Sequence, residues 1–126
     1  MLKLIDAPGG AEKAAQQLAA ARQKDPKAKL FDEALVNEIG YEHLQEGDTK
    51  GAIAILKLNV NAFPKSANVY DSLSDAYLAD GQKDLARENA KKALELLPTD
   101  SSISEEYRKG MKENAENKLK QLGGKP

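Results

Sequence analysis

The sequence reads ANVYDSLSDAYLADGQKDLARENAKKALELLP over residues 67–98, and this segment carries the clearest structural pattern in the chain. Apolar and small side chains recur every three or four residues on both sides of Gly81, which is the pattern of two amphipathic helices joined by a turn. Glycine at the turn permits the left-handed backbone that the chain needs to reverse. Because Pro98 cannot continue a helix, it marks the end of the second one. The stretch therefore predicts an antiparallel helical hairpin.

The same pattern occurs 34 residues earlier in the chain. Laying residues 33–66 over 67–100 pairs identical residues at turns, small positions and helix ends: Leu44 with Leu78, Gly47 with Gly81, Ala52 with Ala86, Lys57 with Lys91, and Pro64 with Pro98. Chance alone would give about two identities at average residue usage. The period predicts two stacked hairpin units, 33–64 and 67–98, each with one face directed inward.

The inward residues follow from the helical spacing. In the first unit they are Leu35, Val36, Ile39, His43 and Leu44, then Ala52, Ile53, Leu56, Val60 and Phe63. In the second they are Tyr70, Leu73, Ala76 and Tyr77, then Ala86, Ala90, Ala93, Leu94 and Leu97. Asp32, Asp48 and Ser66 stand where N-caps of three of these helices are expected.

Further helices are predicted on both sides of the two units. Residues 1–10 are expected to be an extended linker, and residues 11–26 half a repeat, with Ala14, Leu18 and Ala21 on one stripe and Pro26 at its end. Ser102 and Glu105 have capping-box spacing and open a last helix, residues 102–122. Its one apolar stripe suits a helix that caps a repeat array: Ile103, Tyr107, Met111, Ala115, Leu119 and Leu122.

Length and composition predict one small domain, residues 11–126. The chain has no Cys, no apolar run of the roughly 20 residues that span a bilayer, and no signal-peptide pattern. The cytoplasm is therefore the default compartment. Residues 1–30, 31–100 and 101–126 carry charges of +3, −6 and +2, which sum to −1. Acidic repeats argue against nucleic acid as the partner.

Catalytic motifs are absent from the sequence. A beta-lactamase-type site needs Ser with Lys one helical turn later, and no serine here has Lys three residues on. The sequence also lacks a Gly-x-Ser-x-Gly elbow, a His-Glu-x-x-His pair and a Gly-rich phosphate loop. The chain is therefore expected not to be an enzyme and to need no cofactor. The catalytic alternative is a fragment of a serine hydrolase with an activity of its own.

Two features could also bind a metal. His43, the only histidine, could be a ligand or a general base, but its place on the inward stripe favours packing. Asp71 and Asp75 lie four residues apart on one helical face and could hold a cation, although solvated repulsion is the commoner state of such a pair. No metal site is predicted.

The second unit resembles the tetratricopeptide repeat at the positions that carry its signature: Tyr70, Leu73, Tyr77, Gly81, Ala86, Ala93 and Pro98. The first unit matches at Gly40, Gly47, Ala52 and Pro64 but has His43 where Tyr is usual and Val36 where a larger residue is common. The resemblance implies a short right-handed α-solenoid of two hairpins, flanked by an N-terminal helix and a C-terminal capping helix.

A narrower resemblance rests on Glu38-Ile39-Gly40-Tyr41, on residues 52–60 (AIAILKLNV) and on residues 66–73 (SANVYDSL). These segments are similar to the repeat-bearing C-terminal extension of some bacterial beta-lactamase-like serine hydrolases and esterases. This similarity implies an alternative role, a structural accessory to a hydrolase that contributes stability or dimerisation.

The tetratricopeptide resemblance implies a concave groove formed by the first helix of each unit. It assigns to the groove Asn37, Tyr41 and Gln45 from the first unit and Asn68, Asp71, Asp75 and Ala79 from the second. Some proteins of the family clamp a peptide carboxylate here, but the two aspartates would repel one. We expect a protein or peptide partner with a basic or neutral segment, with Tyr41 as its apolar platform, and neither nucleic acid nor a membrane.

The competing interpretation is that the groove holds only solvent or a part of the same chain. The basic segment of residues 24–29 (KDPKAK) is the internal candidate, because it accompanies an acidic array.

Overall fold

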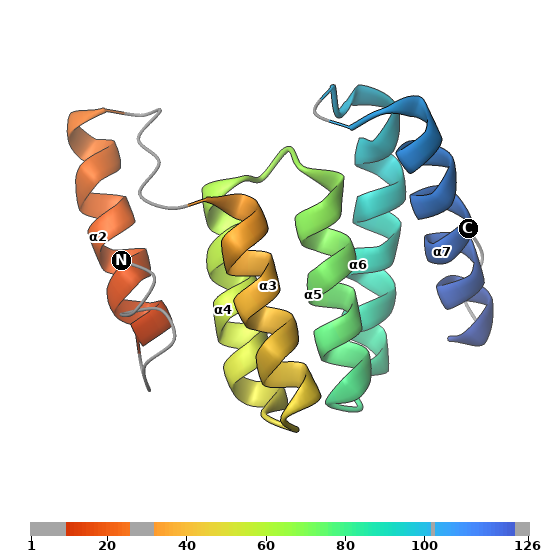
Figure 1. The fold of residues 1–126 in the computed structure, drawn as a ribbon, viewed down its shortest axis with the longest axis horizontal. Coiled ribbons are helices and arrows are strands. Elements are labelled where there is room, and N and C mark those ends of the chain that lie inside the picture. Colours follow the sequence, from red (N-terminus) through yellow and green to blue (C-terminus); the bar gives the residue numbers. More distant parts are fainter. Residues whose placement is uncertain (1–9, 26–31, 102, 123–126) are drawn as a thin grey trace. The chain divides into compact units, whose positions relative to one another are not determined.

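The computed structural model describes residues 10–25, 32–101 and 103–122. Every regular element within these ranges is a helix, so the prediction of an all-α fold is confirmed (Figure 1). The elements are α2 (Gly10–Lys24), α3 (Glu33–Gln45), α4 (Thr49–Ala62), α5 (Ala67–Ala79), α6 (Lys83–Leu96), the 3-10 turn η1 (Leu97–Thr99) and α7 (Glu105–Gln121). None of the helices in this described part is long and apolar enough to cross a membrane.

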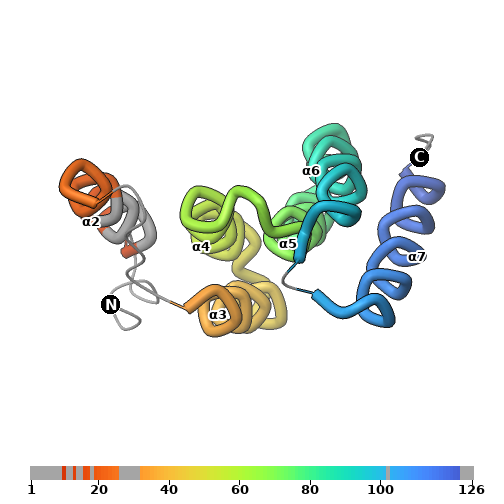
Figure 2. The backbone as a smooth tube through the Cα atoms, turned by 90° about the horizontal axis from the view of Figure 1, so that it is seen from above, coloured from red at the N-terminus to blue at the C-terminus, as the bar shows by residue number. Residues whose placement is uncertain are grey.

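The chain divides into two compact units, Met1–Pro64 and Lys65–Pro126. The first contains α2, α3 and α4, and the second contains α5, α6, η1 and α7. Each unit is built on one antiparallel hairpin, α3 with α4 and α5 with α6, and Figure 2 shows the helices from above. The helices of these hairpins lie within the predicted units 33–64 and 67–98. The division into repeat units and the single domain over residues 11–126 stay predictions.

Both hairpins turn through the same backbone motif. Gly47 and Gly81 have positive φ angles of 85° and 80°. After α3, the amide of Asp48 donates to the carbonyl of His43 at 2.8 Å; after α5, the amide of Gln82 donates to the carbonyl of Tyr77 at 2.9 Å. This is the Schellman arrangement, which satisfies carbonyls that a helix end leaves unpaired. The 34-residue period therefore reproduces backbone geometry as well as residue type.

The hairpin of the first unit depends on a close approach between its helices. A Cβ atom at Gly40 of α3 would lie 2.5 Å from a methyl carbon of Leu56 on α4, so any larger residue there would force Leu56 to move. Val36 and Ala52 are fully buried in the same unit. Leu35 was predicted to point inward, but 44% of it is exposed. The two positions are adjacent on the helix, and the buried face admits only one of them.

Helix α2 packs against α4 in the first unit. The Arg22 guanidinium donates to the carbonyls of Asn61 at 2.8 Å and Ala62 at 2.7 Å, so it satisfies the C-terminal end of α4. Gly10 begins α2 and does not belong to a linker. Residues 1–9, Pro26 and the side chains of Ala14 and Leu18 lie outside what the structure describes.

In the second unit, α5 and α6 pack closely through small residues. Ser74 is fully buried and its hydroxyl donates to the carbonyl of Ala86 at 2.7 Å. The predicted inward residues Leu73, Ala76, Tyr77, Ala86, Ala90, Ala93 and Leu97 are buried, whereas Tyr70 and Leu94 are half-buried. Helix α6 ends at Leu96, and Pro98 lies two residues later, within η1.

The N-caps follow the prediction only in part. Asp32 accepts hydrogen bonds from the amides of Ala34 and Leu35, and Asp48 accepts one from Gly51, as expected. Ser66 makes no capping bond. The buried carboxylate of Asp100 accepts from the amide of Ala67 at 2.8 Å instead. An acceptor from a distant segment therefore replaces the local cap that the sequence pattern suggests.

Helix α7 packs against α6 and completes the second unit. It buries Met111, Ala115, Leu119 and Leu122, and Arg87 of α6 donates to the carbonyl of Leu122 at 2.6 Å. The helix begins at Glu105 with Ser104 as its N-cap, so the predicted start at Ser102 is wrong, and Ser102 itself lies outside the described residues. Tyr107 also departs from prediction, because 53% of it is exposed.

Candidate functional site

The second unit contains a groove between α5 and α7. Its α5 side carries Asp71, Asp75 and Leu78, and its α7 side with the preceding loop carries Ser104, Glu106, Tyr107, Gly110, Met111, Asn114, Asn117, Lys118 and Gln121. Asp71 lines both halves of the groove. One half lies toward the N-terminal end of α7, around Tyr107, and the other toward its C-terminal end, around Lys118. We call these the Tyr107 half and the Lys118 half.

The groove exists because each helix presents a polar stripe beside its buried one. On α7, Tyr107, Asn114, Lys118 and Gln121 are spaced by seven, four and three residues, so they share a face of the helix. On α5, Asn68, Asp71 and Asp75 follow the same spacing. The Tyr107 hydroxyl lies 3.5 Å from Asn68 Oδ1, and Lys118 reaches both aspartates, so the two stripes face one another.

Lys118 holds the acidic side of the groove together. Its Nζ lies 2.9 Å from Asp71 Oδ1 and 2.6 Å from Asp75 Oδ1, and it also donates to the backbone carbonyl of Asp71 at 3.3 Å. Only 10% of the Lys118 side chain and 17% of the Asp71 side chain are exposed. One ammonium therefore neutralises part of the charge of two carboxylates in a site with little water.

The pKa values of Asp71 and Lys118 reflect the sharing of one ammonium by two carboxylates. Burial raises the pKa of Asp71 above its ordinary value, the positive charge and hydrogen bond of Lys118 offset part of the rise, and the nearby charge of Asp75 adds to it. Burial alone would lower the pKa of Lys118, but attraction to Asp71 and Asp75 raises it above 10.5. Lys118 is therefore charged at neutral pH, and among the described residues it is the cation that pairs with Asp71.

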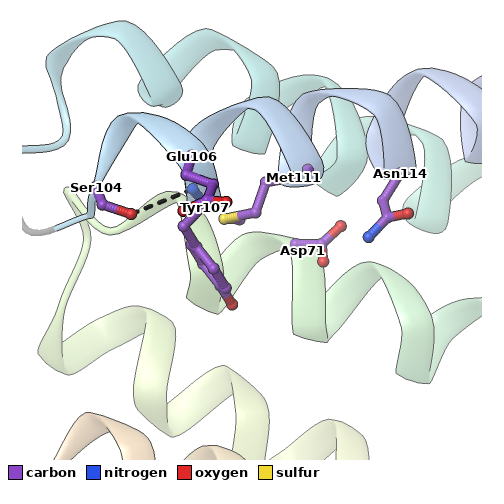
Figure 3. Close-up of a pocket in the computed structure, with 7 residues that line it drawn as sticks. Asp71, Ser104, Glu106, Tyr107, Met111 and Asn114 are labelled. Atoms are coloured by element: carbon purple, nitrogen blue, oxygen red, sulfur yellow. Dashed lines mark hydrogen bonds between the residues drawn. The ribbon is translucent and has the colours of Figure 1, made fainter.

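The Tyr107 half of the groove is open and has an aromatic wall. Figure 3 shows Tyr107 extending from α7, with Met111 beside it and the side chains of Asp71 and Asn114 on opposite helices. The Ser104 hydroxyl accepts from the Tyr107 amide at 3.2 Å, which fixes the first turn of α7. A Cβ atom at Gly110, which also lines this half, would meet nothing within 4 Å, so this position leaves open space beside the groove.

The electrostatic character of the groove is acidic. Among the described residues that line it, Asp71, Asp75 and Glu106 are carboxylates and Lys118 is the only cation, which leaves two net negative charges. In the described part of the chain, no three His, Asp or Glu side chains are grouped as a metal site requires. The arrangement suits recognition of a donor or a cation by carboxylate, amide and aromatic groups.

The structure brings together half of the predicted site. Asn68, Asp71 and Asp75 lie on α5 and face α7, whereas Ala79 is exposed. Asn37, Tyr41 and Gln45 lie on α3 in the other unit, where the first two are half-buried and the third is exposed. The basic partner of the aspartates is Lys118, from the same chain. Residues 26–29 of the basic segment proposed for that role lie outside the described residues.

Sequence reasoning missed Tyr107, Asn114 and Lys118 as groove residues. Tyr107 was assigned to the buried stripe because it precedes Met111 by four residues. Lys118 lies outside the apolar stripe predicted for α7 and carries no sequence signal that separates it from the other lysines of this helix. The signal that could have found them is a run of uncharged polar residues at helical spacing within an otherwise charged helix: Asn114, Asn117 and Gln121.

His43 has a local role in the first unit. Its Nδ1 lies 2.8 Å from Asp48 Oδ2, while Asp48 Oδ1 accepts from the amide of Gly51 at 3.0 Å. The hydrogen bond with His43 and that from Gly51 lower the pKa of Asp48. His43 thus supports the N-cap of α4 and is more polar in its contacts than a residue that only fills the core.

The chain matches no protein-family model, and a comparison with curated proteins found no significant match.

Proposed function

We propose that this chain is a tetratricopeptide-repeat-like module that binds a protein or peptide without catalysing a reaction, and that the groove between α5 and α7 receives the partner. The observation that carries the proposal is the Tyr107 half of the groove. It combines an aromatic ring that is 53% exposed, a glycine that leaves room, and a mostly buried carboxylate. Exposed aromatic residues next to polar groups are typical of peptide-binding surfaces.

The hairpin geometry supports the family assignment within this proposal. The turn of each antiparallel pair contains a glycine in the left-handed backbone region, Gly47 in one and Gly81 in the other. Gly40 allows α3 and α4 to approach closely. Short hairpins that stack into a right-handed solenoid use small residues in this way. In that arrangement α7 takes the position of a capping helix, and the face it turns toward α5 becomes part of the binding groove.

The net charge of the groove selects the partner. Two uncompensated negative charges repel a carboxylate and favour a basic or neutral segment. Lys118 already occupies the acidic pair in the Lys118 half, so the Tyr107 half is where a partner side chain gains most. The partner is thus a segment of basic or neutral character that passes over Tyr107.

A selection from a random library of 15-residue peptides tests the proposal. The wild-type chain is expected to enrich a peptide family that Tyr107→Ala no longer binds. Leu85→Ala is the matched control, because Leu85 is another exposed large apolar residue, on α6 and outside the groove lining. Failure to enrich any peptide, or peptides that bind Tyr107→Ala as tightly as the wild type, would refute the function.

A further inference from the structure

Asp71 has one oxygen with a partner and one without. Its Oδ1 accepts from Lys118 at 2.9 Å, and its Oδ2 has no hydrogen-bond partner among the described residues. The side chain is only 17% exposed, and it lines the groove, so its second oxygen is the acceptor that remains for a partner. A carboxylate that is largely removed from solvent gains most from a charged donor.

The space beside Asp71 has the form of a slot for a long side chain. Met111 and the ring of Tyr107 line it as apolar surfaces, and Gly110 leaves open space between side chains. The carboxylates of Asp71 and Glu106 and the amide of Asn114 supply acceptors around it. An aliphatic stem can lie along Met111 and Tyr107 while a cationic head reaches the acceptors.

Charge distinguishes between the possible occupants. A neutral amide would satisfy Oδ2 as a donor but would leave two net negative charges in the groove, and an anion would add to them. A guanidinium or ammonium donates to Asp71 Oδ2 and at the same time reduces the net negative charge of the groove. Either group can also stack on the Tyr107 ring. Lys118 shows that this chain already pairs Asp71 with a cation on its other side.

Building on the proposed function, we propose that the Tyr107 half of the groove is a pocket for one arginine or lysine side chain of the partner, which pairs with Asp71 Oδ2 while Lys118 retains Oδ1. Asp71 thereby bridges an internal cation and an external one. Asp75 stays with Lys118 and does not contact the partner. Specificity for a basic residue is expected at one position of the bound segment and not along its whole length.

The test uses the peptides recovered by the library selection. Each basic residue is replaced in turn by an uncharged analogue of similar shape, citrulline for arginine and norleucine for lysine. One replacement is expected to weaken binding to the wild-type chain by about tenfold or more, as loss of a hydrogen bond to a charged group does. The same replacement should have little effect with Asp71→Asn, because the two changes remove one interaction.

Two further variants separate folding from binding. Gly110→Leu fills the slot without touching the pair between Asp71 and Lys118, and it is expected to abolish binding while α7 stays folded. Glu113→Gln removes a negative charge from α7 outside the groove lining and is expected to change affinity less than twofold at physiological salt.

The outcomes distinguish the inference from the function on which it rests. Peptides that bind the groove but tolerate every uncharged replacement would overturn the basic-side-chain pocket and leave the binding function standing. Binding that is insensitive to Gly110→Leu would overturn both. A one-position requirement for charge that disappears with Asp71→Asn supports both.

Discussion

The ammonium of Lys118 lies 2.9 Å from Asp71 Oδ1, so the last helix supplies the cation for the acidic face of α5. The residues that α5 contributes to the groove are therefore not an empty acidic surface. They form a network with α7, and this network both stabilises the second unit and sets the charge that a partner meets.

Replacing Lys118 with methionine should destabilise the second unit. The methionine retains most of the buried stem, but Asp71 and Asp75 lose their shared cation and become uncompensated charges. Breaking a buried pair typically costs about 3–5 kcal/mol; because Asp75 is partly exposed, we expect a loss of about 2–4 kcal/mol in the free energy of unfolding. Urea denaturation measures it. Lys120→Met, an exposed position on the same helix, is the control and should change stability by less than about 0.5 kcal/mol.

The same pair predicts a dependence of stability on alkaline pH. The pKa of Lys118 is raised above 10.5 in the folded chain, so its contribution is fully present below pH 10.5 and is lost as pH rises through the raised value. The melting temperature of the wild type should therefore fall toward that of Lys118→Met above pH 10.5. Taking the difference between the two proteins removes the contribution of other groups that titrate in alkali. A constant difference from pH 8 to 12 would contradict the assignment.

The repeat period predicted the hairpins well because it is carried by residues with local consequences. Gly47 and Gly81 determine a backbone conformation that few other residues adopt, and Ala52 and Ala86 are fully buried in equivalent places. The structure at such positions depends mainly on residues within one or two helical turns along the chain. Hydrophobic spacing and turn chemistry report them directly.

The groove was less predictable because it depends on contacts between distant segments. Ser66 has the form of an N-cap, yet Asp100 supplies the acceptor from 33 residues away along the chain. Tyr107 continues the apolar stripe of α7 in sequence but lies largely in solvent. Spacing places a residue on a helix face and does not say how far along the helix the packing partner extends.

Glycine at position 40 should be essential for the first hairpin. Gly40→Ala puts a methyl group within 2.7 Å of two Leu56 side-chain carbons, so Leu56 must move within a packed core. Overpacking of this kind costs about 1–3 kcal/mol. Gly110→Ala is the matched control, since nothing lies within 4 Å of its new atom, and it should stabilise α7 by about 0.5–1 kcal/mol through helix propensity. Chemical denaturation of the two variants checks both signs, and destabilisation by both would contradict the packing argument.

The two hairpin turns should be equally sensitive to alanine. Gly47→Ala and Gly81→Ala force a side chain into the left-handed region at φ of 85° and 80°, although neither new atom meets a neighbour. Conformational strain alone should cost about 1–2 kcal/mol at each site. Asparagine tolerates this region better, so Gly47→Asn and Gly81→Asn should lose less. Alanine variants as stable as the wild type would show that the turns relax to another conformation.

Arg22 should control the attachment of α2 to the first unit. Its guanidinium donates to the carbonyls of Asn61 and Ala62, which are left without helical partners at the end of α4. Arg22→Met retains an apolar side chain but removes both bonds, and hydrogen bonds to a charged donor contribute about 1.5–3 kcal/mol. Because α2 can open without unfolding the hairpin, its amides should exchange with solvent about tenfold faster or more while those of α3 and α4 change little. Hydrogen exchange followed by mass spectrometry measures this, with Lys24→Met, an exposed cation on the last turn of α2, as the control. Unchanged exchange in α2 would mean that apolar packing on α4 holds the helix by itself.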